Sequence, residues 1–213
     1  MAGGIVKKAV HIPINSLDLE GDLSVPEKNK GVIVFVHGSG SSRLSPRNQF
    51  VAEILNKAGF ATLLFDLLTE DEDRTYENRF NTPLLAERLK EATDWLKEQE
   101  DIENIPMGYF GASTGAAAAI IGAAEIGAEI KAVVSRGGRP DLAGKALSKL
   151  KSPILLIVGG EDYEVIELNK EAASQIVCKK EIKIVDGATH LFEEPGTLEK
   201  AAELAKNWFE RHL

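Results

Sequence analysis

Short apolar runs alternate with longer stretches of helical periodicity along almost the whole chain. The runs have the length of β-strands and lie at residues 31–36 (GVIVFV), 60–65 (FATLLF), 105–110 (IPMGYF), 130–135 (IKAVVS), 153–158 (PILLIV) and 181–185 (EIKIV). This alternation is typical of a mostly parallel β-sheet with helices on both faces. The sequence therefore predicts an α/β fold.

Two more strands are expected at residues 5–14 and 21–25. Their connection, around residues 17–20, is too short for a helical crossover, so they should form an antiparallel start to the sheet. Thr82 is the expected N-cap of one helix, and Pro83 is its expected first residue. The connection at residues 66–81 is unusually long, which indicates a functional or mobile segment. Helices are expected at residues 46–58, 83–99, 114–127, 141–150, 164–177 and 198–211.

Size and charge narrow the class of protein. The 213 residues are 44% hydrophobic, which suits a single domain spanning residues 1–213. Twenty-five basic against 33 acidic residues give a net charge of −8, which argues against a nucleic-acid partner. No apolar run approaches the roughly 18 residues of a membrane span, and no signal peptide is recognisable. With one cysteine, Cys178, a cytoplasmic protein without a membrane or nucleic-acid partner is expected.

The strongest chemical motif is GASTG at residues 111–115, between an apolar strand and an alanine-rich helix. A Gly-x-Ser-x-Gly turn in this context presents its serine above the sheet edge, and Gly111 and Gly115 let strand and helix pass closely. It makes Ser113 a candidate nucleophile and the backbone N–H of Thr114 a candidate oxyanion donor. The alternative is a tight turn whose serine only caps the helix.

A nucleophilic serine needs a base and an acid. His190 follows the last strand and is the histidine expected at the same sheet edge as Ser113. Asp162 follows the preceding strand and is the best-placed acid, with Glu161 and Asp66 as rivals. Asp162 could instead be a helix N-cap. The chain order serine, aspartate, histidine is the order of an α/β-hydrolase.

The loop HGSGSS at residues 37–42 follows the third strand and is glycine-rich. Its Ser39 N–H is the natural second oxyanion donor beside that of Thr114. His37 is expected to orient the loop through hydrogen bonds. A phosphate cradle is the rival interpretation, although neither GxxxxGK[ST] nor GxGxxG occurs.

These motifs resemble those of α/β-hydrolases of the dienelactone hydrolase-like group, and particularly the small hydrolase domain sometimes fused to phosphoribosyltransferases. The resemblance extends through HGSGSSRLSPRNQFVAE, ATLLFDLLTEDED, FGASTGAAAA, VVSRGGRPDLAG, LLIVGGEDYEV and GATHLFEEPG. It implies an eight-stranded sheet, a catalytic triad on Ser113, Asp162 and His190, and an oxyanion hole at Ser39 and Thr114. Dienelactone hydrolases proper carry cysteine where this chain has Ser113, so their lactone substrate does not transfer.

Arginines flank these motifs. Arg43 and Arg47 lie beside the oxyanion loop, and Arg136 and Arg139 leave the strand between those that carry Ser113 and Asp162. Arg43, Arg136 and Arg139 are candidates for binding a substrate carboxylate or phosphate. The alternative is that they brace loops by pairing with acidic residues such as Asp66 or Asp141.

The sequence thus predicts a single-domain serine hydrolase without a separate cap domain. The simplest activity is that of a carboxylesterase acting on small short-acyl esters, and the ester substrate could be anionic. No cofactor or metal is expected. A lactonase or acyltransferase using the same triad is the first alternative, and a non-catalytic binding domain with a vestigial triad is the second.

Overall fold

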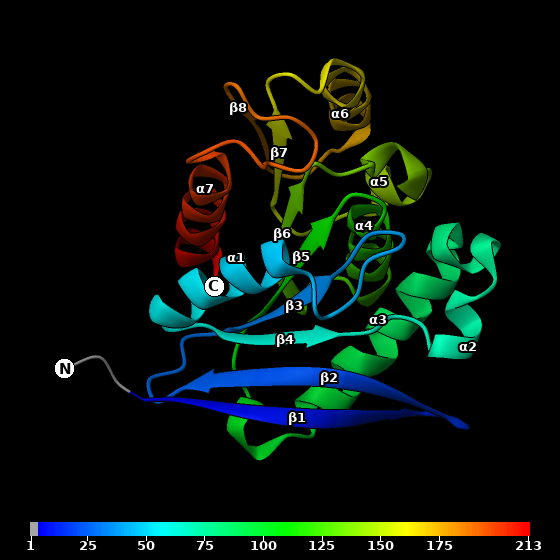
Figure 1. Ribbon diagram of the computed structural model, residues 1–213, viewed down its shortest axis with the longest axis vertical. Coiled ribbons are helices and arrows are strands. Elements are labelled where there is room, and N and C mark those ends of the chain that lie inside the picture. Colours follow the sequence, from blue (N-terminus) through cyan, green and yellow to red (C-terminus); the bar gives the residue numbers. More distant parts are fainter. Residues whose placement is uncertain (1–3) are drawn as a thin grey trace.

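The computed structural model describes residues 4–213, and its strands form one eight-stranded sheet in the order β1-β2-β4-β3-β5-β6-β7-β8 (Figure 1). Strands β3 to β8 are parallel, while β2 pairs antiparallel with both β1 and β4. The predicted α/β fold, with a mostly parallel eight-stranded sheet, is confirmed. The strands are β1 Ile5–Ile14, β2 Leu17–Pro26, β3 Val32–Val36, β4 Ala61–Phe65, β5 Met107–Ala112, β6 Ile130–Arg136, β7 Ile154–Gly159 and β8 Lys180–Val185.

The hairpin between β1 and β2 is tighter than expected. Ile14 pairs with Leu17, so only Asn15 and Ser16 form the loop, and the expected connection at residues 17–20 belongs to β2. Asn15 has a φ of 54°. Asparagine tolerates this left-handed conformation better than most residues, which allows a two-residue turn.

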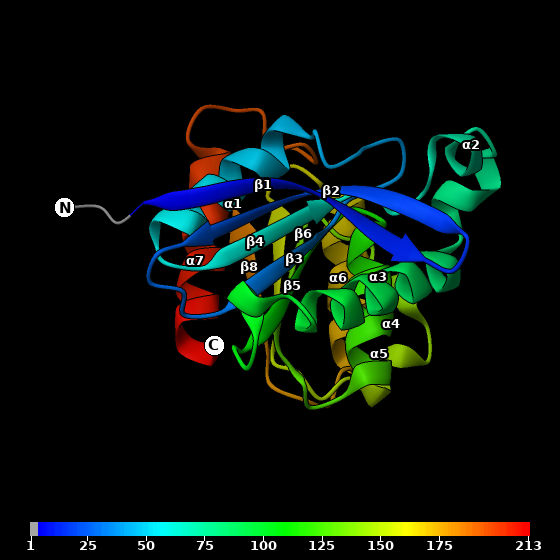
Figure 2. The same ribbon diagram turned by 90° about the horizontal axis from the view of Figure 1, so that it is seen from below.

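Helices cover both faces of the sheet (Figure 2). Helices α1 (Pro46–Lys57) and α7 (Thr197–His212) lie on one face, and α3 (Thr82–Lys97), α4 (Gly115–Ile126) and α6 (Tyr163–Gln175) on the other. Each side has its own apolar core, and the sheet separates the two. The helix expected at residues 141–150 is two short pieces, η3 (Pro140–Ala143) and α5 (Ala146–Lys149), because Gly144 between them has a φ of 51°.

The long connection at residues 66–81 is folded. It contains α2 (Glu70–Asp73) and the 3₁₀ turn η1 (Tyr76–Phe80), and another turn, η2 (Glu100–Ile102), follows α3. Thr69 and Glu72 form a reciprocal capping box that starts α2. The N-cap of α3 is Asn81, whose side chain accepts from the Leu84 N–H, so the expected N-cap, Thr82, is instead the first helical residue.

The two ends of the described chain lie away from the carboxyl ends of the parallel strands (Figure 1). Strand β1 begins, and α7 ends, near the edge where β3 starts (Figure 1). Leu213 packs there so closely against Gly31 that a Cβ placed on this glycine would lie 2.9 Å from the Leu213 Cδ2. The candidate catalytic residues and the glycine-rich loop follow the carboxyl ends of β3, β5, β7 and β8, at the opposite edge. Over residues 4–213, no helix is long and apolar enough to cross a membrane.

Candidate active site

Ser113 occupies a strained turn between β5 and α4. Its φ is 51°, a conformation that costs a non-glycine residue about 1–3 kcal/mol. The neighbouring glycines make the turn possible, since a Cβ on Gly111 would lie 2.5 Å from the Ala116 Cα and one on Gly115 would lie 2.1 Å from the Val36 oxygen. The predicted strand-turn-helix context of GASTG is therefore present.

His190 and Asp162 lie beside Ser113. The Ser113 Oγ is 3.4 Å from the His190 Nε2, and the His190 Nδ1 is 2.7 Å from the Asp162 Oδ2. Because a carboxylate only accepts hydrogen bonds, Nδ1 carries the proton and Nε2 is left as the acceptor facing Ser113. Asp162 does stand at the N-cap position of α6, but its side chain makes no capping bond. Its carboxylate hydrogen-bonds His190 and does not cap the helix.

Close backbone packing holds Asp162 and His190 together. A Cβ on Gly159, at the end of β7, would lie 2.4 Å from the Ala188 oxygen. The Glu161 N–H also donates to that oxygen, at 2.9 Å. These contacts fix the turn that carries Asp162 against the loop that carries His190.

The rival acids have other partners. Asp66 accepts from the backbone N–H of Arg43 at 2.7 Å and pairs with its guanidinium. Glu161 accepts from the Tyr163 hydroxyl at 2.7 Å. Of the three candidate carboxylates, only Asp162 contacts His190 among the hydrogen bonds of residues 4–213.

The loop after β3 packs onto the candidate nucleophile, Ser113. A Cβ on Gly38 would lie 3.0 Å from the Ser113 Cβ. The two candidate oxyanion donors are linked to each other, because the Ser39 N–H donates to the Thr114 Oγ1 at 2.8 Å. In this structure the Ser39 N–H therefore points to the threonine hydroxyl, which sequence reasoning did not anticipate.

His37 orients this loop. Its Nδ1 lies 3.0 Å from the Gly38 oxygen, and its Nε2 accepts from the Leu67 N–H at 3.1 Å. Both bonds require the neutral ring with the proton on Nδ1. Burial lowers the pKa of His37, which favours that neutral form.

A cavity of about 250 Å³ opens above Ser113. The sequence-predicted residues Ser39, Ser113, Arg136 and His190 line it, whereas Arg43, Thr114, Asp162 and Arg139 do not. Sequence reasoning did not single out Asn48, although it follows Arg47 in the helix after the glycine-rich loop. The lining residues are Gly38, Ser39, Ser41, Ser45, Arg47, Asn48, Ala112, Ser113, Arg136, Gly137, His190 and Leu191.

Two of the candidate binding arginines brace loops. Arg43 pairs with Asp66 and Glu20 and lies 3.6 Å from the Asp22 carboxylate. Arg139 makes a two-pronged contact with Asp141, at 2.9 and 2.8 Å. Neither guanidinium lines the cavity of Ser113, so the bracing alternative fits these two positions.

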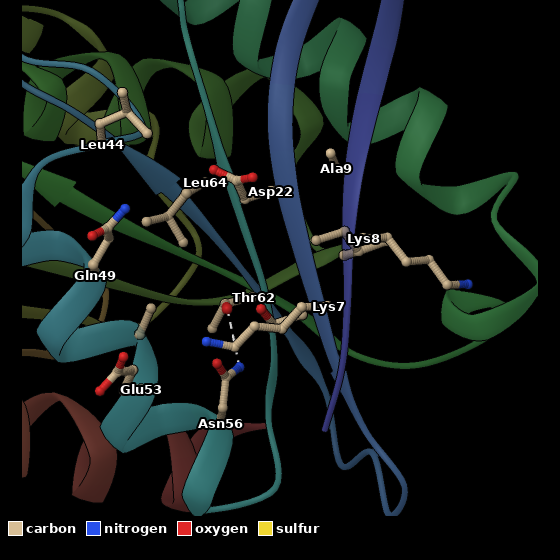
Figure 3. A pocket seen from close by; sticks show the side chains of 13 residues that line it. Lys7, Lys8, Ala9, Asp22, Leu44, Gln49, Glu53, Asn56, Thr62 and Leu64 are labelled. Atoms are coloured by element: carbon tan, nitrogen blue, oxygen red, sulfur yellow. Dashed lines mark hydrogen bonds between the residues drawn. The ribbon is translucent and has the colours of Figure 1, made fainter. Parts of the chain in front are cut away.

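A second hollow, of about 400 Å³, lies between α1 and strands β1, β2 and β4 (Figure 3). Its side chains include Lys7, Lys8, Gln49 and Glu53, and its Asn56 amide donates to the Thr62 hydroxyl at 3.0 Å. None of the candidate catalytic residues lines it. Within residues 4–213, no group of three or more histidine, cysteine, aspartate or glutamate side chains is arranged to hold a metal ion.

The sequence model of the dienelactone hydrolase family matches residues 19–213. The chain belongs to the dienelactone hydrolase family. It is 50% identical to a dienelactone hydrolase from Anabaena variabilis whose crystal structure superposes with a TM-score of 0.95, over 98% of this chain and 99% of that one. The Butyrivibrio proteoclasticus protein Est1E is 18% identical with a TM-score of 0.80, covering 95% of this chain and 98% of that one, and so shares the fold.

This dienelactone hydrolase family member also resembles two Mycobacterium tuberculosis proteins that carry the provisional name phosphoribosyl transferase. Each is 56% identical over 204 residues, which are 96% of this chain and 46% of the relative. The chain thus spans about half the length of these relatives. The resemblance deduced from the sequence motifs is confirmed, and the protein is an α/β-hydrolase of this family.

Proposed function

We propose that the protein is a serine hydrolase that cleaves small carboxylic esters through an acyl-enzyme. The observation that carries the proposal is the line of contacts from the Ser113 Oγ to the His190 Nε2, at 3.4 Å, and from the His190 Nδ1 to Asp162, at 2.7 Å. A serine, histidine and carboxylate in this geometry can deprotonate the hydroxyl and stabilise the resulting imidazolium. A binding domain needs no such arrangement.

The chemistry divides into two half-reactions. The His190 Nε2 takes the proton of Ser113 as its Oγ attacks the ester carbonyl, and the imidazolium then gives that proton to the departing alkoxide, which leaves as the alcohol. Water, deprotonated by His190, attacks the acyl-enzyme next. The proton returns to the Ser113 Oγ, and the carboxylic acid is released.

The negative charge on the carbonyl oxygen needs donors. The Thr114 backbone N–H, at the start of α4, is the first of them. The Ser39 N–H can be the second donor only if it turns away from the Thr114 hydroxyl, which it contacts at 2.8 Å, or donates to both oxygens at once. Binding of substrate would exchange this internal acceptor for the carbonyl oxygen.

The cavity volume favours short substrates. At about 250 Å³ it lies below the roughly 300–1,000 Å³ of ordinary small-molecule pockets. A short acyl group fits such a space better than a long lipid chain. The proposed substrates are therefore small, short-acyl esters.

Labelling tests the nucleophile and the triad together. A fluorophosphonate probe should modify Ser113, identified by peptide mapping, and Ser113→Ala should lose both labelling and about 10⁴- to 10⁶-fold in turnover of p-nitrophenyl acetate. Ser148→Ala is the matched control, since Ser148 lies in α5 and its hydroxyl hydrogen-bonds the Lys145 carbonyl, away from the cavity lining. Labelling elsewhere, or a Ser113→Ala variant that keeps a tenth of the activity, would exclude the mechanism. Transfer of the acyl group to an added alcohol in preference to water would indicate an acyltransferase.

A further inference from the structure

Arg136 is a buried cation without a counter-ion. It ends β6, and 7% of its surface is exposed. Within residues 4–213, every other arginine lies within 4.0 Å of a carboxylate, and Arg136 lies near none: the paired arginines are Arg43, Arg47, Arg74, Arg79, Arg88, Arg139 and Arg211. Arg88 is a useful contrast, because it is 9% exposed and contacts both Glu72 and Glu91. Arg88, the other buried arginine, thus has acidic partners, whereas Arg136 has none within 4.0 Å among the described residues.

The guanidinium of Arg136 also has unused donors. Its Nη2 donates to the Asn48 Oδ1 at 3.3 Å, and its charge lies 5.8 Å from the centre of the Phe192 ring. The Nε and Nη1 atoms are buried and have no hydrogen-bond partner in the described chain. Buried donors are nearly always paired in native proteins. The Nε of Arg88 is unpaired as well, but of these two arginines only Arg136 lines a cavity from which an acceptor outside the chain could approach.

The surroundings favour an anion. No aspartate or glutamate is among the residues that line the cavity, although the protein as a whole carries a charge of −8. The second cation there is Arg47, whose carboxylate partner, Glu193, is 3.5 Å away and 64% exposed. Burial, and secondarily the charge of Arg47, lower the pKa of Arg136 to about 10. The attraction of a negative charge in the cavity would offset both effects.

The arrangement of donors suggests which anion. They come from three elements: Arg136 from β6, Arg47 and Asn48 from the first turn of α1, and Ser41 from the glycine-rich loop. A planar carboxylate is satisfied by one guanidinium edge, whereas a tetrahedral phosphate accepts hydrogen bonds from several directions and carries up to two charges. The positive end of the α1 dipole adds to this preference.

We propose that Arg136 and Arg47 form a phosphate subsite beside Ser113, so that the substrate is a small ester whose alcohol part carries a phosphate group. The inference rests on the proposed esterase function for its catalytic part. Binding of phosphate by the cavity does not depend on that function.

Matched acetyl esters test the specificity. The acetyl group stays constant while the alcohol part changes, in 2-acetoxyethyl phosphate, 3-acetoxypropanoate and neutral propyl acetate, with acetate release measured at constant ionic strength. We expect the wild-type kcat/KM to be highest for the phosphate ester. Arg136→Gln should lower the ratio of the kcat/KM for the phosphate ester to that for propyl acetate about ten- to hundredfold. Arg74→Gln is the control for net charge, because Arg74 is exposed and paired with Asp71, remote from the cavity lining.

Thermal stability measured with inorganic phosphate tests binding without catalysis. Phosphate should raise the Tm of the wild type and of Ser113→Ala, and should not raise that of Arg136→Gln or Arg47→Gln. Arg136→Lys keeps the charge without the planar fork and should bind more weakly than the wild type, which covers the case in which Arg136→Gln fails to fold.

The outcomes separate the two proposals. If no ester is cleaved and no fluorophosphonate label is incorporated, the esterase function fails, while an Arg136-dependent phosphate shift would still support the subsite. Equal kcat/KM for phosphate and neutral esters, a preference for the carboxylate ester, or a phosphate shift that persists in Arg136→Gln would each overturn the phosphate subsite.

Discussion

Replacing Arg136 by methionine should make the protein more stable when no anion is bound, which is an unusual expectation for a buried side chain that lines the same cavity as Ser113. Burial lowers the pKa of Arg136 to about 10, at least about 2 pH units below an ordinary guanidinium. At about 1.4 kcal/mol per unit, the buried charge costs about 3 kcal/mol. Because the folded-state pKa is depressed, this cost is fully present below about pH 10 and fades as the pH rises above that value.

Methionine also removes favourable contacts. The hydrogen bond to Asn48 contributes about 1 kcal/mol and the contact with the Phe192 ring about 0.5–1 kcal/mol. The net gain in the free energy of unfolding is therefore about 1 to 1.5 kcal/mol. For a chain of 213 residues this corresponds to a Tm higher by roughly 2 to 6 °C.

The assay is urea and thermal unfolding at pH 7, in a buffer free of phosphate and sulfate, so that no anion fills the cavity. Arg88→Met is the matched control, because Arg88 is equally buried but contacts Glu72 at 2.9 Å and Glu91 at 3.5 Å. It should lower the stability, since two carboxylates lose their partner. A drop in Tm for Arg136→Met under these conditions would refute the reasoning that its charge is uncompensated.

Three further predictions follow from the site. Asp162→Asn should lower kcat about 10²- to 10⁴-fold while Glu161→Gln stays within about tenfold, and the reverse ranking would move the acid to Glu161. Gly115→Ala should abolish esterase activity and lower the Tm, because the new Cβ would lie 2.1 Å from the Val36 oxygen; an active, equally stable variant would contradict the packing of the turn. The lowered pKa of His37 means that the unfolded chain binds more protons below about pH 6.5, so stability should fall as the pH drops from 7 to 5, by up to about 1.4 kcal/mol per pH unit. The loss of stability between pH 7 and pH 5 should be smaller in His37→Gln than in the wild type. If stability falls equally with pH in both proteins, the titration of His37 is not its cause.

The fold and the grouping of Ser113, His190 and Asp162 were predictable because they depend on short-range patterns. Each residue follows an apolar strand, and parallel strands bring their carboxyl ends to one edge. The same rule could not place the arginine side chains. Arg43 and Arg139 begin at that edge as well, yet they turn to Asp66 and Asp141. Where a long flexible side chain ends depends on the acidic groups that the folded loops bring within its reach.

Two finer features could not be predicted from the sequence either. The N–H of Ser39 points to Thr114, a hydrogen bond between residues separated by 75 positions that no local motif encodes. The two-residue turn at Asn15 and Ser16 depends on one asparagine in a left-handed conformation, and its position was missed because no glycine or proline marks it.

The position of the chain ends has a practical consequence. Strand β1 starts, and Leu213 packs against Gly31, near the edge where β3 starts (Figure 1), whereas Ser113 follows the carboxyl end of β5 at the opposite edge. A linker, an affinity tag or a second folded module joined near either end would therefore emerge on the far side of the molecule from the cavity of Ser113. Tethering the protein to a solid support through its carboxyl terminus should leave that cavity facing the solution, which makes this chain suited to fusion and immobilisation.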